Sequence, residues 1–188
     1  MVEGKDTTQL DILLMSDTHE AWDNLEKFKK LSEKEGNSAY DYVFLSGDQA
    51  NLKNKPGEPI DVAANKLGEE SNARFLSELE PFASASETSK LFYIPGNHDS
   101  ECFFSDEPPV QGTKSQNIHK QVVELQPDLL LVGFGGCGPT IWLPDGETEW
   151  KQASWEFYPY ATEEAFIADL KALWSEKVEP RLAANPNT

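Results

Sequence analysis

The chain has 188 residues, of which 38% are hydrophobic, enough for one buried core but not comfortably for two. We therefore expect a single domain over residues 1–188. Its 33 acidic and 16 basic side chains give a formal charge of −17, which argues against nucleic acid as a partner because such binding depends on cationic side chains. The amino terminus is too polar for a signal peptide, and no segment approaches the roughly 20 apolar residues of a membrane span. With no CxxC pair either, we expect a cytoplasmic protein that does not bind membranes.

The first half of the chain alternates short apolar runs with helical patterns. Residues 12–15, 42–45 and 91–94 are continuous apolar runs, and each is followed by polar residues. A helix is predicted over residues 21–35, and a second helix is predicted to end before Pro81. Buried strands separated by helices predict an α/β fold in which parallel strands are covered on both faces.

The second half of the chain predicts a hairpin and one more helix. Residues 122–125 and 129–132 are two short apolar runs joined by a turn that contains Pro127, and so short a connection favours an antiparallel pair. A glycine-rich segment and a loop rich in tryptophan, tyrosine and proline follow. Residues 161–178 then carry apolar side chains at helical spacing, so the last predicted element is an amphipathic helix.

Polar side chains with metal-binding or catalytic chemistry follow each of the first three predicted strands. The carboxyl ends of parallel strands lie at one edge of a sheet, where ligands of such folds bind, so we expect these side chains to meet. Each cluster alone has an ordinary explanation, because Asp-x-His often occurs by chance and both Gly-Asp and Asn97 are typical of turns. Three such clusters at successive strand ends favour one composite site. The residues are Asp17, His19, Asp48, Asn97, His98 and Asp99.

The side chains of these clusters suit divalent cations of the first transition row. Asp17 offers a carboxylate, and His19 offers a neutral imidazole two residues later. Asp48 could bridge two ions with its two oxygens, and Asn97 supplies a neutral oxygen. These four residues are therefore the predicted metal ligands.

Three motifs, in this order along the chain, resemble those of a known family. DTH (residues 17–19), GD (47–48) and GNHD (96–99) resemble the first three motifs of the calcineurin-like metallophosphoesterase superfamily. The stretches NIHKQVVEL and LLLVGFGG also resemble its smaller members and extend the likeness to about residue 137. The resemblance implies an αββα sandwich and the hydrolysis of phosphate monoesters or diesters.

The resemblance also implies how the site residues would act. Two divalent ions, which we expect to be manganese, iron or zinc, would be bridged by Asp48 and would clamp an attacking metal-bound hydroxide and the phosphoryl oxygens. The ions would also reverse the local sign of charge, so that a chain of −17 could accept an anionic ester. His98 would contact the substrate phosphate or protonate the leaving group, with Asp99 as its orienting partner.

The sequence departs from this family in its histidines. Members complete the site with three further histidines from later strands, in TH or GH and GHxH patterns, whereas this chain has three histidines in all. The third, His119, matches no ligand motif, and we expect it to be an ordinary surface residue. We therefore expect the carboxyl-terminal part of the fold to be incomplete and the domain to be truncated. The alternative function is a binding scaffold that keeps the fold with weakened or lost hydrolysis.

Overall fold

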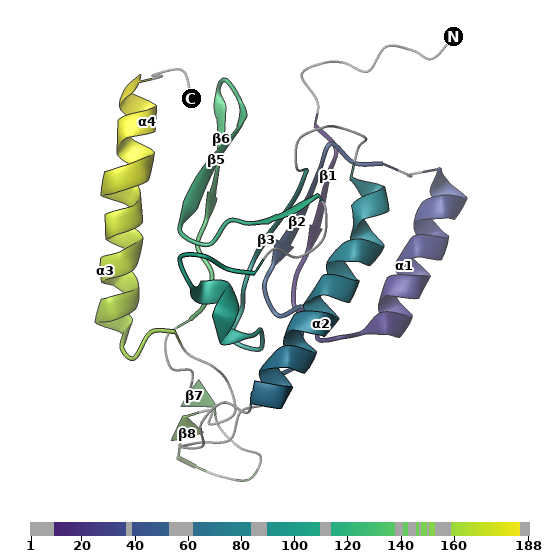
Figure 1. The fold of residues 1–188 in the computed structure, drawn as a ribbon, viewed down its shortest axis with the longest axis horizontal. Helices are drawn as coiled ribbons and strands as arrows, with labels where there is room; N and C mark the ends of the chain where they lie inside the picture. Colours follow the sequence, from purple (N-terminus) through teal and green to yellow (C-terminus); the bar gives the residue numbers. More distant parts are fainter. Residues whose placement is uncertain are drawn as a thin grey trace.

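The structure is a computed structural model and describes residues 10–36, 39–52, 62–83, 90–109, 114–137, 141–142, 146, 148–149, 151–152 and 159–184. Figure 1 labels its main helices and strands. In chain order the elements are β1 (Ile12–Met15), α1 (Trp22–Glu35), β2 (Tyr42–Ser46), α2 (Val62–Leu79), η1 (Glu80–Phe82), β3 (Leu91–Ile94), η2 (Glu101–Phe104), β4 (Ser115–Asn117), β5 (Gln121–Gln126), β6 (Leu129–Gly133), β7 (Ile141–Trp142), β8 (Lys151–Gln152), α3 (Glu163–Leu173), η3 (Trp174–Val178) and α4 (Glu179–Ala184).

A parallel sheet of four strands, in the order β1-β2-β3-β4, organises the fold. Val43 in β2 pairs with Leu13 on one side and with Leu91 on the other, so the strands are nearly in step. The three loops that leave the carboxyl ends of β1, β2 and β3 therefore start at the same edge. This confirms the predicted α/β fold class and the predicted parallel strands.

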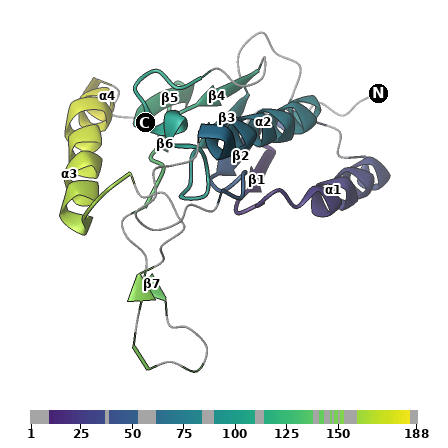
Figure 2. The same cartoon turned by 60° about the horizontal axis from the view of Figure 1, so that its bottom comes forward.

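Strands β2 and β3 are covered on both faces, as their continuous apolar residues predicted. The prediction of a buried strand was wrong for one face of the edge strand β1, where Ile12 is 44% and Leu14 is 67% exposed. Alternate residues of β2 point to opposite faces: Val43 and Leu45 join a core cluster with Phe75 of α2, while Tyr42 packs with Ile118 and Phe92. The second cluster also takes in apolar residues of the β5–β6 hairpin. Figures 1 and 2 show the resulting order of layers: α1 and α2, the sheet, the hairpin, and then α3 with α4. This is the αββα order that the sequence predicted.

The last helix extends beyond the predicted end at residue 178. It begins at the N-cap Thr162, whose hydroxyl accepts the N–H of Ala165, and it continues through a π-helical segment to Ala184. Pro180 has no N–H to donate, and its ring crowds the carbonyl four residues earlier, which accounts for the widened turn just before it. Among the described residues, no helix is both long enough and apolar enough to cross a membrane.

His119 corrects the expectation of a surface histidine. It follows β4 and is 9% exposed, because α3 and η2 cover the turn between β4 and β5. Its ring contacts Phe104 edge-on, with ring centroids 5.2 Å apart, and its Nδ1 accepts the N–H of Gly135 at 3.0 Å. Burial, helped by the nearby Lys120 ammonium, lowers the pKa of His119 to about 4, although the carboxylates of Asp169 and Asp106 oppose the shift. The polar neighbours of His119 in sequence gave no sign of this cover.

The buried His119 is expected to make stability depend on pH. Its folded-state pKa lies below the unfolded value of about 6.5, so protons bind the unfolded chain more tightly and stability falls as the pH is lowered from about 6.5 toward 4. At pH 5 the loss should be about 2 kcal/mol relative to pH 7. The variant His119→Gln can still accept the N–H of Gly135 but has no imidazole to protonate. We expect its free energy of unfolding in urea to fall by about 2 kcal/mol less than that of the wild type between pH 7 and pH 5. Equal losses in both proteins would contradict a neutral buried imidazole.

Candidate metal centre

Three loops meet at the carboxyl edge of the sheet: residues 16–21 after β1, 47–52 after β2 and 95–100 after β3. Backbone hydrogen bonds tie them together, with the N–H of His19 donating to the Asp48 carbonyl at 2.8 Å and the N–H of Leu52 donating to the His98 carbonyl at 3.0 Å. The loops that follow these strands are therefore in direct contact, as the parallel arrangement predicted. Their side chains are held by a continuous backbone framework.

The first two loops hold an unusual backbone conformation. Four non-glycine residues there have positive φ angles between 42° and 58°, in the left-handed region that side chains disfavour. Strained residues of this kind persist where the surrounding structure fixes them, and they are frequent at functional sites. The four residues are Asp17, His19, Glu20 and Asp48.

His19, Asp48 and His98 converge on one point, with one potential ligand atom from each lying within 4.8 Å of the others. The Nε2 atom of His19 is 3.9 Å from Oδ2 of Asp48. The two imidazole rings meet edge to face, with centroids 4.7 Å apart. One carboxylate and two imidazoles are ligands that suit zinc, manganese or iron.

The side chain of His98 is positioned by two backbone contacts. Its own N–H donates to Oδ1 of Asp48 at 2.9 Å, and its ring Nδ1 lies 3.0 Å from the carbonyl oxygen of Leu52. A carbonyl can only accept, so Nδ1 carries the proton and Nε2 keeps its lone pair. A backbone carbonyl bound in this way fixes both the tautomer and the orientation of a catalytic or metal-binding histidine.

Asp99 lies beneath the loops and is fully buried. Its carboxylate accepts the backbone N–H groups of Gly96, Asp48 and Ala50, each at 2.8 Å, and so joins the second loop to the third. Burial raises the pKa of Asp99 to about 7, the Asp48 carboxylate adds to the rise, and the three N–H groups oppose it. The side-chain amide of Gln49, with its nitrogen turned toward Oδ2, donates a further hydrogen bond to this carboxylate at 3.1 Å. The predicted role of Asp99 as the partner of the His98 ring stays a prediction.

Gly96 allows the third loop to approach Asp48. A Cβ atom at this position would lie 2.1 Å from Oδ1 and 2.6 Å from the backbone nitrogen of Asp48. A Cβ at Gly47 would likewise lie 2.9 Å from the Cα of Gly96. The glycines of the GD and GNHD motifs are therefore needed for the close contact of the two loops.

The site fits a divalent cation in its chemistry. Nδ1 of His19 is buried without a hydrogen-bond partner among the described residues, which is costly for an imidazole nitrogen unless something binds it. Asp48 is 8% exposed, so its carboxylate is largely removed from water. A bound cation would offset the cost of this buried carboxylate.

One predicted ligand, Asp17, lies outside the converging group. Its side chain is exposed, accepts a hydrogen bond from Ser16 and lines a groove beside Leu25 of α1. Asn97 is half-buried in the third loop, between Gly96 and His98. Their roles as ligands stay predictions. Leu52, whose carbonyl contacts the His98 ring, was not predicted, because a backbone group in a loop leaves no signal in the sequence.

Comparison with known proteins agrees with this fold. A sequence model of the calcineurin-like phosphoesterase family matches residues 10–187. The chain belongs to this family, whose members usually hydrolyse phosphoester bonds and typically bind divalent metals. No curated protein and no solved structure matches the chain significantly.

Proposed function

We propose that this protein is a metal-dependent hydrolase of phosphate esters, either monoesters or diesters, whose active site lies at the carboxyl edge of the parallel sheet. The observation that carries the proposal is the convergence of His19, Asp48 and His98 within 4.8 Å, on strained loops that the backbone holds rigidly. Membership of the calcineurin-like phosphoesterase family supports the reaction class.

In this proposal the site holds two divalent ions, with Asp48 between them. His19 and Asp17 would hold the first ion, and Asn97 would hold the second. The 3.9 Å distance between Nε2 of His19 and Oδ2 of Asp48, and the position of Asp48 between the second and third loops, support these roles. When bound, the ions supply the positive charge that attracts an anionic ester and acidify the water that attacks it.

His98 would act on the substrate through Nε2. With Nδ1–H held by the Leu52 carbonyl, protonation of Nε2 makes the ring a donor toward the phosphate or the leaving oxygen. The same atom could instead serve as a metal ligand, because His98 belongs to the converging group. Removal of the His98 ring would lower kcat if the ring is a general acid, and would lower metal affinity if the ring is a ligand.

The experiment measures the hydrolysis of 4-nitrophenyl phosphate and bis(4-nitrophenyl) phosphate with added Mn²⁺, together with Mn²⁺ affinity by calorimetry. The wild-type protein is expected to be active with Mn²⁺ and inactive in excess EDTA. His98→Ala is expected to lower kcat about 100-fold, as loss of a general acid does, and to leave Mn²⁺ affinity unchanged. A fall in Mn²⁺ affinity would instead make His98 a ligand.

A binding scaffold is the second candidate function. The converging group contains two of the three histidines of the chain, and His119 is not part of it, so the site has few imidazole ligands for two ions. Absence of Mn²⁺-dependent hydrolysis of both substrates, in a protein that still binds Mn²⁺, would favour the scaffold.

A further inference from the structure

Gln49 follows Asp48 in the second loop and is a buried polar residue that the proposed mechanism does not use. It is 1% exposed. Its side-chain oxygen accepts the N–H of Gly47 at 3.1 Å, and its side-chain nitrogen donates to Oδ2 of Asp99 at 3.1 Å. Both ends of the amide therefore have a partner. A buried amide that is bonded at both ends holds its neighbours in one arrangement.

The hydrogen bond to Gly47 closes a turn around Asp48. The side chain of Gln49 reaches back past Asp48 to the N–H two residues earlier. The turn contains two positive φ angles, 98° at Gly47 and 57° at Asp48. Such an angle is disfavoured for an aspartate and persists only where neighbouring contacts fix it. The amide of Gln49 is one of these contacts.

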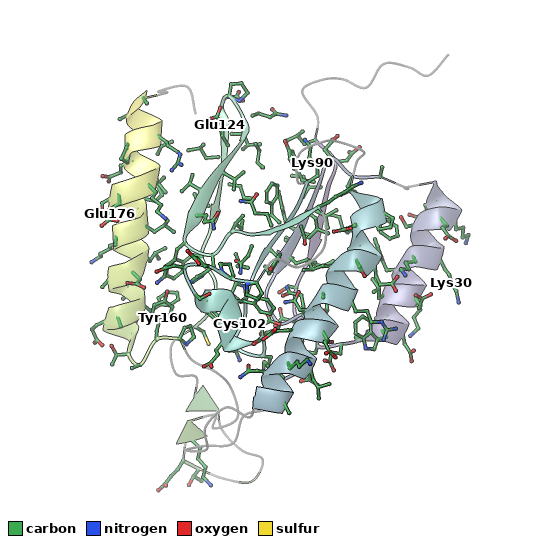
Figure 3. All side chains as sticks on the ribbon, viewed as in Figure 1. Lys30, Lys90, Cys102, Glu124, Tyr160 and Glu176 are labelled. Carbon is green, nitrogen blue, oxygen red and sulfur yellow. The ribbon has the colours of Figure 1, made fainter. Side chains whose placement is uncertain are left out.

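The hydrogen bond to Asp99 ties this turn to a firmly held part of the molecule. The chain that follows Asp99 is attached to α2 by two side chains. The hydroxyl of Ser100 donates to Oδ1 of Asn65 at 2.9 Å, and the thiol of Cys102 (labelled in Figure 3) donates to Oε1 of Glu69 at 3.4 Å. Loss of the amide would therefore release the turn in the second loop rather than the third loop.

Gln49 also contacts the first loop, through its backbone. Its carbonyl accepts the N–H of Glu20 at 3.1 Å, beside the bond from the N–H of His19 to the Asp48 carbonyl. This one residue thus joins the three loops that carry the converging side chains. A substitution at position 49 removes the side-chain bonds and leaves the backbone bond in place.

We propose that Gln49 is a positioning residue of the metal centre, whose amide holds the Asp48 carboxylate in place between the two histidines. In this position Oδ2 of Asp48 lies 3.9 Å from Nε2 of His19, and Oδ1 accepts the N–H of His98 at 2.9 Å. An amide suits the role because it donates to a carboxylate and accepts an N–H at the same time. The inference rests on the proposed function only in assigning this site to a divalent metal.

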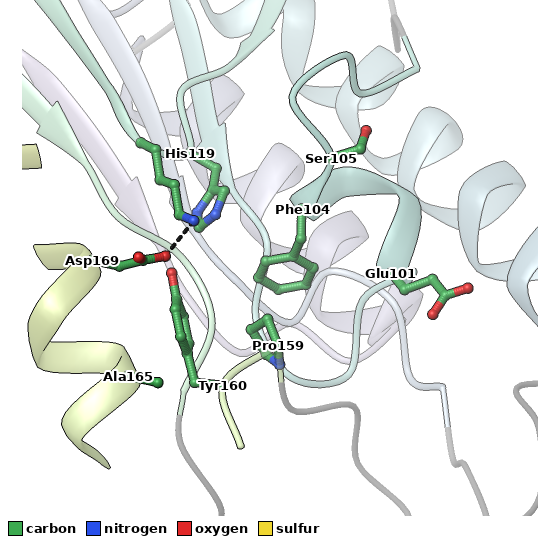
Figure 4. Close-up of a pocket in the computed structure, with 9 residues that line it drawn as sticks. Glu101, Phe104, Ser105, His119, Pro159, Tyr160, Ala165 and Asp169 are labelled. Atoms are coloured by element: carbon green, nitrogen blue, oxygen red, sulfur yellow. Dashed lines mark hydrogen bonds and ion pairs between the residues drawn. The ribbon is translucent and has the colours of Figure 1, made fainter. Parts of the chain in front are cut away.

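The test uses Gln49→Met, which keeps the length of the side chain and removes both of its hydrogen bonds. We expect calorimetry to show about tenfold weaker Mn²⁺ binding, or about 1.4 kcal/mol. In the metal-free protein, we expect the imidazole NMR signals of His19 and His98 to shift. The signals of His119, the third histidine of the chain, should stay in place, because its ring lines a separate pocket between η2 and the beginning of α3 (Figure 4).

Gln121→Met is the matched control. Gln121 is a partly buried glutamine of β5 whose side-chain oxygen accepts a hydrogen bond from the amide of Gln116. This variant should leave both Mn²⁺ affinity and the His98 signals unchanged. Gln49→Asn is a second test variant, which keeps an amide but is one methylene too short to reach Gly47 and Asp99 together. We expect it to show the same losses as Gln49→Met.

The metal-free NMR comparison separates this inference from the proposed function. A wild-type protein that binds no Mn²⁺ would contradict the proposed function, and the signals of His19 and His98 would still test the role of Gln49. That role is overturned if a folded Gln49 variant keeps these signals or binds Mn²⁺ within twofold of a wild type that binds it. It is also overturned if the His119 signals move as far, or if neither variant folds, since Gln49 would then serve stability alone.

Discussion

Replacing Asp48 with asparagine is expected to lower kcat/KM for both nitrophenyl substrates at least 100-fold, equivalent to about 2.7 kcal/mol of transition-state stabilisation. The asparagine oxygen can still accept the N–H of His98, so the third loop should keep its position. What is lost is the negative charge and the second oxygen, which lies 3.9 Å from Nε2 of His19. Mn²⁺ affinity should therefore fall together with activity.

The stability of Asp48→Asn separates this loss from unfolding. Without metal, the wild-type protein buries a carboxylate close to that of Asp99, and the variant removes this repulsion. We therefore expect the metal-free variant to unfold at the same or a higher urea concentration than the wild type. Asp128→Asn, at an exposed acid in the hairpin turn, is the control and should change neither property. Activity within threefold of the wild type would remove Asp48 from the proposed mechanism.

The strands that position the site could be predicted because their residues are continuously apolar. Short continuous apolar runs at residues 12–15, 42–45 and 91–94 indicate strands of a parallel sheet. Strands β1 and β3 have the predicted bounds, and β2 is one residue longer. Strand β4 could not be found in the same way. Its residues, Ser115–Asn117, are polar and are held by backbone pairing with β3 and by the Asn117 amide, which donates to the carbonyl of Phe103. Such pairing depends on the partner strand and leaves no periodic pattern.

The composition of the site was easier to predict than its geometry. Parallel strands bring the three loops to one edge whatever the details of each loop, so the meeting of His19, Asp48 and His98 followed from topology. The direction of each side chain depends instead on the positive φ angles at Asp17 and Asp48 and on backbone hydrogen bonds between loops. Two residues that are adjacent in an irregular loop need not point the same way. Adjacency to His98 in sequence therefore could not reveal that the Asp99 oxygens accept three backbone N–H groups.

Gly96→Ala is expected to destabilise the fold by about 3 kcal/mol, because the new methyl group would lie 2.1 Å from Oδ1 of Asp48 and 2.6 Å from its backbone nitrogen. Relief of this clash must separate the second and third loops, so Mn²⁺ affinity should also fall at least tenfold. Gly36→Ala is the matched control. Gly36 has a positive φ of 73° at the end of α1, and no atom lies within 4 Å of the added carbon. This substitution should therefore destabilise the fold by about 1 kcal/mol and leave Mn²⁺ affinity unchanged. Urea unfolding and calorimetry measure both effects. If Gly96→Ala cost no more than Gly36→Ala, the close contact between the loops would not be what places Asp48.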